Sequence, residues 1–173
     1  KSNTEADSKP HVFHITTAVA STGGHTEAMC NWIREDPDRT YSVVLTSQEG
    51  SIPPKLSASV AESGGQVFSA PFESDVTEKA RFVFDTIDTR ANAVVFQLYA
   101  DDISGLLPFC RDGGPPVIIY NTVDHLPWLG ITLTDLIAEI RESGTRVSEN
   151  HRGCLRSSPL PVYVREADKF TEE

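Results

Sequence analysis

Short runs of apolar residues alternate along the chain with segments whose apolar residues recur at helical spacing. The runs are rich in β-branched and aromatic side chains, which are typical of strands. The run at 93–99 is continuously apolar, as in a strand buried on both faces. We expect strands at 11–17, 41–46, 66–70, 93–99 and 117–120. The pattern also allows a strand at 145–148 and, at 160–164, either a last strand or the start of a connection to another domain.

Helical periodicity occupies most of the intervals between these strands. It predicts a helix at 25–35, a weak one at 53–63, one at 76–87 that Ser74 caps, and a short one within 102–111 that Pro108 bends or ends. The clearest helix is predicted at 132–143, with Thr132 and Asp135 as a possible capping box and Gly144 at its end. Four apolar residues form its inner face: Leu133, Leu136, Ile137 and Ile140.

Strands that alternate with helices favour the α/β class. We expect a Rossmann-like three-layer α/β/α sandwich with a mostly parallel sheet of five to seven strands. Residues 1–10 read as a flexible lead-in, 11–165 as a single domain and 166–173 as a tail. In such sheets ligands bind at the carboxyl ends of the strands, so the loops there are the first candidates for function.

Charge and composition narrow the function classes. The 173-residue chain has 15 basic and 25 acidic residues, a net charge of −10 at pH 7, and its basic residues are scattered. Nucleic-acid binding needs clustered Lys and Arg, so we do not expect nucleic acid as a partner. The one basic cluster, Arg146, His151, Arg152 and Arg156, is either a solvated loop or a contact for a phosphate or an anionic lipid headgroup.

The sequence also bears on location. No apolar run approaches the roughly 20 residues of a membrane span, and residues 1–10 lack the apolar core of a secretory leader. The three cysteines, Cys30, Cys110 and Cys154, are widely spaced and suggest neither a disulfide framework nor a zinc site. Cys30 and Cys110 lie in apolar helical patterns, so we expect buried free thiols and a cytoplasmic protein.

The first candidate loop, TAVASTGGHT at 17–26, follows the first strand. Adjacent glycines let a backbone approach a ligand and adopt positive φ, and a helix that begins there presents free N–H groups to a phosphate. The loop is neither a GxGxxG nor a Walker A motif, so Gly23 and Gly24 fit either phosphate binding or a tight turn. His25 faces either a ligand or the loop itself.

The second candidate loop, NTVDHLPWLG at 121–130, follows the fifth strand and concentrates polar side chains. His125 is a candidate base or hydrogen-bond donor, with Asp124 orienting it or acting itself, although a single loop histidine is more often structural. Asn121 lies at the expected cleft mouth, and Trp128 is either a packing anchor or a stacking platform.

Two further positions have mainly structural interpretations. His14 alternates within the first strand, which indicates a core or edge histidine. Asp101 and Asp102 follow the fourth strand and are expected to be an acidic pair at a helix amino end rather than metal ligands. The sequence therefore concentrates its candidate chemistry in two loops.

These two loops together resemble the N-terminal domain of GT-B-fold glycosyltransferases, a large group that includes many bacterial cell-surface sugar transferases. The matching segments are STGGHTEAMCNWI at 21–33, VIIYNTVDHLPWLG at 117–130 and RESGTRVSENHRGCLRSSPLPV at 141–162. A bacterial subgroup has Asn-His-Ala-Asp-His-x-Phe-Trp-Leu-Gly where this chain has 121–130. Its first His is replaced here by Thr122 and its Phe by Pro127. The resemblance covers about 11–165.

The resemblance implies a role for each candidate residue. The Gly-Gly loop of such enzymes approaches the donor diphosphate, which implies donor-phosphate binding by Gly23, Gly24 and His25. A histidine after the fifth strand often contacts the transferred sugar, which implies catalytic roles for His125 and Asp124. Two residues, Asn121 and Trp128, would then line the acceptor side of the cleft.

The resemblance also implies a set of partners. The substrates would be a nucleoside diphosphate sugar and a carbohydrate or lipid-linked acceptor, without a cofactor or metal ion, because many members are retaining enzymes that need none. No second Rossmann pattern or paired-glutamate donor motif follows residue 164. We therefore expect the C-terminal donor-binding domain to be absent and this chain alone to be inactive. The full-length enzyme is expected in the cytoplasm, either free or bound peripherally to a membrane.

The alternative interpretation is a non-catalytic Rossmann-like or flavodoxin-like domain that binds a ligand or a partner. A response regulator is disfavoured, because no acidic pair follows the first strand and no lysine follows the fifth. The two remaining interpretations differ in whether the loop at 121–130 performs chemistry on a ligand or only holds one.

Overall fold

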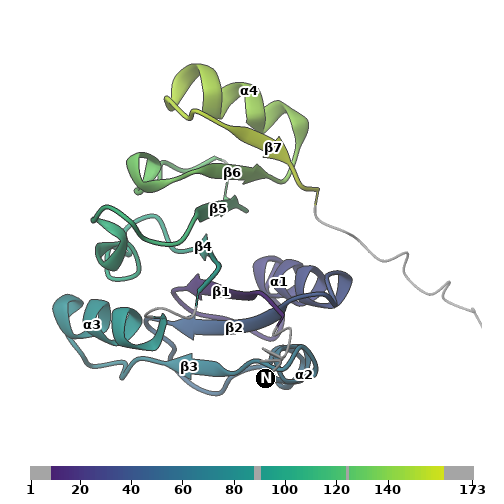
Figure 1. Cartoon of the computed structure of the whole chain (residues 1–173), viewed down its shortest axis with the longest axis vertical. Helices are drawn as coiled ribbons and strands as arrows, with labels where there is room; N and C mark the ends of the chain where they lie inside the picture. Colours follow the sequence, from purple (N-terminus) through teal and green to yellow (C-terminus); the bar gives the residue numbers. More distant parts are fainter. Residues whose placement is uncertain (1–8, 88–90, 124, 162–173) are drawn as a thin grey trace, which may run out of the picture.

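The computed structural model describes residues 9–87, 91–123 and 125–161. In these residues, seven parallel strands form one sheet in the order β3-β2-β1-β4-β5-β6-β7 (Figure 1). The strands are β1 (His11–Thr16), β2 (Thr40–Leu45), β3 (Val67–Ser69), β4 (Ala93–Gln97), β5 (Val117–Asn121), β6 (Leu136–Glu139) and β7 (Ser157–Pro159).

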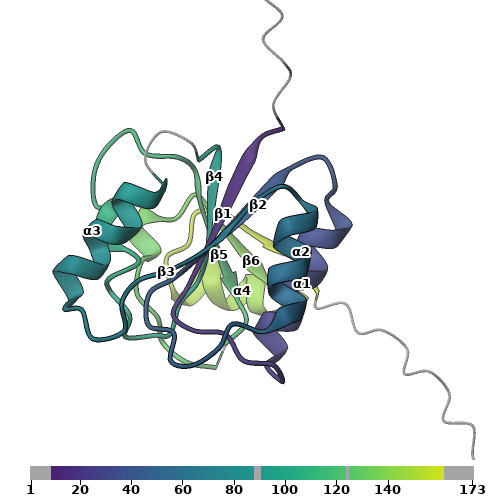
Figure 2. The ribbon, with the colours of Figure 1, turned by 90° about the horizontal axis from the view of Figure 1, so that it is seen from below.

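Helices lie on both faces of this sheet, and Figure 2 shows α1 and α2 on the side opposite α3. The α4 helix lies over the α3 face, because it packs on the Glu139 side of β6 while Ala138 faces the α1 side. Right-handed crossovers require this arrangement. The helical elements are α1 (Gly24–Glu35), α2 (Pro54–Glu62), α3 (Val76–Ile87) and α4 (Glu142–His151), with the 3-10 turns η2 (Leu107–Phe109) and η3 (Ile131–Leu133).

The sheet separates two apolar cores. Met29 and Ile33 of α1 pack on the inward residues of β1, β2 and β4, and Val83 and Ile87 of α3 pack on the opposite face. Cys30 is buried in the first core, and burial raises the pKa of its thiol. Because β1 pairs with both β2 and β4, its carboxyl end is the point where the strand order reverses.

The predicted fold class is confirmed: the sheet has seven strands, all parallel, in a Rossmann-like α/β fold. Strands β1, β2, β3, β4 and β5 lie within about two residues of their predicted bounds, as do α1, α2 and α3. The sequence identified these elements because their apolar patterns are strongly periodic or continuous.

The predictions for residues 132–148 were wrong. The expected helix at 132–143 is instead η3 followed by β6, and the expected strand at 145–148 lies inside α4. An apolar run this short suits a buried strand as well as a helix face. Gly144 does not end a helix but lies near the start of α4, and the Asp135 carboxylate accepts a hydrogen bond from the Val117 backbone (2.8 Å) rather than capping a helix.

Three smaller predictions also need correction, and one of the two alternatives for 160–164 is removed. The 102–111 segment contains only the turn η2, and Cys110 is exposed. Asp75, not Ser74, caps α3, because its carboxylate accepts a hydrogen bond from the backbone N–H of Glu78 (2.9 Å). The last strand is β7 at 157–159, whereas Leu160 and Pro161 are not in a strand and 162–164 lie outside the described residues.

Candidate functional site

The two candidate loops meet at the carboxyl edge of the sheet. A cavity of about 330 Å³ lies there, beside the reversal of strand order. Its lining comes from the start of α1, the end of β4 and the loop after β5: Gly24, His25, Gln97, Leu98, Tyr99, Thr122 and Val123. Crevices at such switch points are the usual ligand sites of open parallel sheets.

The glycine loop leaves the start of α1 open to this cavity. Gly23 is the N-cap residue in extended conformation (φ −98°), and no side chain caps the helix. A Cβ added to Gly24 would meet nothing within 4 Å, whereas one on Gly23 would lie 3.3 Å from Cε1 of His25. Positive φ is therefore not the reason for these glycines. Packing does not require Gly24 either, and its open backbone leaves room for a ligand.

His25 lines the cavity but also holds the loop. Its Nε2 lies 2.9 Å from the backbone oxygen of Ala18, which only accepts, so Nε2 carries the proton. The Gln48 side chain, which sequence reasoning missed, accepts from the Val19 N–H (2.8 Å) and donates to the Val19 carbonyl (3.3 Å). The side chains of His25 and Gln48 thus hold the backbone of this loop without a bound ligand.

Asp102 ties the ends of β1, β2 and β4 together. Its Oδ2 accepts hydrogen bonds from the hydroxyls of Thr17 (2.8 Å) and Thr46, and its Oδ1 accepts from the backbone N–H (3.0 Å) and hydroxyl (2.5 Å) of Ser104. Thr17 in turn accepts from the Tyr99 N–H (2.9 Å). Asp102 thus lies at the amino end of the helical turn that begins at Ile103, and it also fixes the strand ends that carry the cleft.

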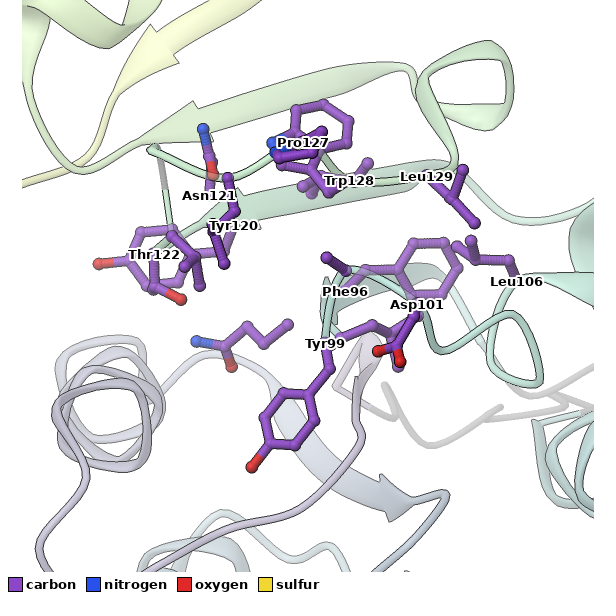
Figure 3. Close-up of a pocket in the computed structure, with 16 residues that line it drawn as sticks. Phe96, Tyr99, Asp101, Leu106, Tyr120, Asn121, Thr122, Pro127, Trp128 and Leu129 are labelled. Atoms are coloured by element: carbon purple, nitrogen blue, oxygen red, sulfur yellow. The ribbon is translucent and has the colours of Figure 1, made fainter.

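A second, larger cavity of about 350 Å³ adjoins the first and shares Gln97, Leu98, Tyr99, Thr122 and Val123 with it. Figure 3 shows Pro127 and Trp128 on one wall, with Phe96, Tyr99 and Asp101 across from them. Its remaining lining is Ala100, Leu106, Ile119, Tyr120, Asn121, Leu126 and Leu129. The two cavities form one groove over the strand ends.

Both residues predicted for the acceptor side line this larger cavity. Asn121 is buried, and its amide nitrogen donates to Oε2 of Glu139 (3.0 Å). Trp128 packs against the α3-side core, and the guanidinium of Arg152 lies over its ring at 5.3 Å. Trp128 is thus a packing anchor that also presents surface to the cavity. Arg152, from the basic cluster, contacts Trp128 but does not line the cavity.

The predicted catalytic pair is not placed at the cavities. Asp124 lies outside the described residues, and His125 is exposed and is not among the residues that line either cavity. Their roles at the transferred sugar stay predictions.

Gln97, at the end of β4, was missed by sequence reasoning and lines both cavities. It is 6% exposed, and neither atom of its amide has a hydrogen-bonding partner. The nearby His14 is fully buried in the α1-side core, as its interpretation as a core histidine predicted. Burial lowers the pKa of His14 to about 4, an effect that the Gln97 side chain opposes.

In the described ranges, no helix is long and apolar enough to cross a membrane, and no three His, Cys, Asp or Glu side chains cluster as metal ligands would. Comparison with models of protein families, with curated proteins and with solved structures gives no match to this chain. The interpretation of the groove therefore rests on its own geometry.

Proposed function

We propose that this chain is the acceptor-side, N-terminal domain of a GT-B-fold glycosyltransferase that moves a sugar from a nucleoside diphosphate sugar to an acceptor. One observation carries the proposal: the start of α1 and the loop after β5 line the same cavity at the switch point of the sheet. In this proposal a donor-binding domain supplies the other wall of the donor site.

The proposed reaction places negative charge on the departing diphosphate. The acceptor oxygen bonds to the anomeric carbon, the bond from that carbon to the diphosphate oxygen breaks, and the hydroxyl proton ends on the nucleoside diphosphate. Backbone N–H groups and the helix dipole at the start of α1 favour an anion. Such preorganised donors stabilise developing charge without a metal ion, and Gly24 leaves them accessible.

The resemblance gives the remaining roles, and four of the residues concerned, Gly24, His25, Asn121 and Trp128, line the two cavities. Gly23, Gly24 and His25 hold the diphosphate end of the donor, while Asn121 and Trp128 belong to the acceptor side. His125 contacts the transferred sugar, and Asp124 orients His125 or acts itself. Hydrogen bonds and proton transfer from such side chains contribute about 100-fold or more to group-transfer rates.

The test is a transfer assay on protein that includes the donor-binding domain, with release of nucleoside diphosphate as the readout. Gly24→Val adds a branched side chain where a Cβ meets nothing within 4 Å, so we expect the fold to persist and turnover to fall about 100-fold. Gly114→Val is the matched control, because an added Cβ there also meets nothing within 4 Å, and Gly114 lines neither cavity.

A second variant tests the loop after β5. His125→Ala is expected to lower transfer about 100-fold while the thermal unfolding midpoint stays at the wild-type value. Wild-type rates in both Gly24→Val and His125→Ala would refute the proposed site and favour a binding module without catalysis.

A further inference from the structure

The larger cavity has walls that are mostly hydrocarbon. Leu98, Leu106, Ile119 and Trp128 line it, and its mouth is bordered by large side chains that remain exposed in the chain alone. Leu129 is 53% exposed, Tyr99 52% and Leu126 44%. Large apolar side chains gathered at one cavity mark a binding surface, because exposing them together to water is unfavourable.

Two buried hydrogen-bonding groups in this cavity have no partner. They are the amide of Gln97, both of whose polar atoms are unpaired, and the indole N–H of Trp128. A buried polar group without a partner costs free energy that folding does not recover. Nearby polar groups are paired in contrast: Asn121 donates to Glu139, and Asp102 accepts from several donors. The ring nitrogens of His14 and the Nε of Arg34 are also buried without a partner, but among these unpaired groups only those of Gln97 and Trp128 line the cavity.

Gln97 also occupies a special place in the groove. It lines both the apolar cavity and the smaller cavity at Gly24 and His25. It faces the α1 side of β4, and its backbone is in register with Thr16 of β1. A polar group bound at Gln97 therefore lies at the boundary between the apolar end of the groove and the end that carries the open start of α1.

We propose that the larger cavity binds the apolar, ring-sized body of an acceptor whose single hydroxyl or amide group pairs with the Gln97 amide. This inference rests on the proposed function, because it names the class of acceptor for the same groove. The apolar body packs against Trp128 and the leucines, and the polar group points to the donor end. Gln97 is in this account a residue that determines acceptor specificity.

A free sugar is a poor fit to this cavity. Its hydroxyl groups point outward all around the ring, and each would need a partner on burial. The buried part of the lining offers two unpaired polar groups, the Gln97 amide and the Trp128 indole N–H, among apolar walls, whereas the polar groups of Tyr99, Asp101 and Thr122 belong to side chains that water reaches. A hydrophobic alcohol or phenol, with one hydroxyl on an apolar body, suits a cavity that has few hydrogen-bonding groups among apolar walls. The cavity volume of about 350 Å³ lies at the lower end of the range for small-molecule pockets.

The probes are 4-ethylphenol, which has the proposed hydroxyl, ethylbenzene, which lacks it, and methyl β-glucoside, a sugar. Each is titrated into the labelled chain without any nucleotide, and binding is followed by NMR. The chain has two tryptophans, so the indole signal of Trp128 reports on the cavity and that of Trp32 serves as an internal reference.

We expect 4-ethylphenol to shift the Trp128 indole and Gln97 amide signals while the Trp32 indole signal stays in place. Gln97→Leu should weaken 4-ethylphenol binding about fivefold and leave ethylbenzene binding unchanged or tighter, because only the phenol loses a hydrogen bond. The matched control is Gln66→Leu, the same change at an exposed position just before β3. It should alter the affinity for neither 4-ethylphenol nor ethylbenzene.

Several results would overturn the inference. They are stronger binding of methyl β-glucoside than of 4-ethylphenol, equal weakening of both aromatic probes by Gln97→Leu, or no shift at Trp128. Loss of the native spectrum in Gln97→Leu would also count against it, because removing an unpaired buried amide should not destabilise the chain. Ala100→Phe, which fills the cavity lining, should block 4-ethylphenol in the same assay.

The outcome is separable from that of the proposed function. If 4-ethylphenol binds at Trp128 but Gly24→Val leaves transfer unchanged, the acceptor-class inference loses its premise while the apolar site itself stands. If Gly24→Val abolishes transfer but 4-ethylphenol does not bind, the glycosyltransferase proposal stands and the apolar acceptor is refuted.

Discussion

Lowering the pH should destabilise this domain through His14. The ring is fully buried and neither nitrogen has a hydrogen-bonding partner. The aromatic rings of Trp32 and Tyr41 lie 5.4 and 5.6 Å away, and the Gln97 side chain, which lies beside the imidazole, opposes the lowering of its pKa only in part. A charged imidazolium in this environment loses its hydration, so the folded chain resists protonation.

The magnitude follows from the two pKa values. Burial lowers the pKa of His14 from 6.5 to about 4, so the unfolded chain takes up the proton first as the pH falls. Stability that is fully present above pH 6.5 is therefore lost progressively until the pH reaches about 4. Between pH 7 and pH 5 the loss amounts to about 2 kcal/mol of unfolding free energy.

The assay is urea unfolding of wild type and His14→Leu at pH 7, 6 and 5. Leucine has a similar size and does not titrate, so the variant retains every other source of pH dependence. The free energy of unfolding of wild type minus that of His14→Leu should fall by about 2 kcal/mol from pH 7 to pH 5. Parallel curves for the two proteins would refute the assignment of a buried, neutral imidazole.

Two substitutions test other contacts. Gly144→Ala places a Cβ 2.5 Å from Oε2 of Glu139, a buried carboxylate that also accepts a hydrogen bond from Asn121. The substitution should therefore lower the free energy of unfolding by about 2 kcal/mol, although alanine favours helices. Gly114→Ala should be near neutral in the same unfolding assay. Asp102→Ala removes the acceptor of Thr17 and should cost about 2 kcal/mol. A larger loss for Gly114→Ala than for either variant would contradict this account.

The sequence predicted most of the fold because β1, β2, β4 and β5 have unmistakable apolar patterns. It failed at 132–151, where the inward side of α4 is not apolar. That side carries Gly144 and Ser148, whose partner is the buried carboxylate of Glu139 on β6. The sequence near Glu139 does not show that its carboxylate is hydrogen-bonded by side chains of α4 and β5. For this reason β6 was assigned to a helix and part of α4 to a strand.

The candidate site shows a similar division. That the loops after β1 and β5 lie at the same edge follows from parallel strand topology, and both line the smaller cavity. Gln97 was not recognised, and the link that Asp102 makes between strand ends was not predicted, because a single glutamine in an apolar strand and an acidic pair after it have no distinctive spacing. Their roles depend on which strands are neighbours in the sheet, and that information comes only from the assembled fold.

The most direct test of the central claim, that the start of α1 holds the diphosphate of a nucleotide sugar, is an NMR titration of this chain with UDP, GDP and inorganic pyrophosphate at millimolar concentrations. The account predicts that the backbone amide signals of Gly24 and His25 shift with added diphosphate, that Gly24→Val removes the response, and that Gly114→Val retains it. Diphosphate binding that is unchanged in Gly24→Val, or no response at Gly24 and His25, would contradict it.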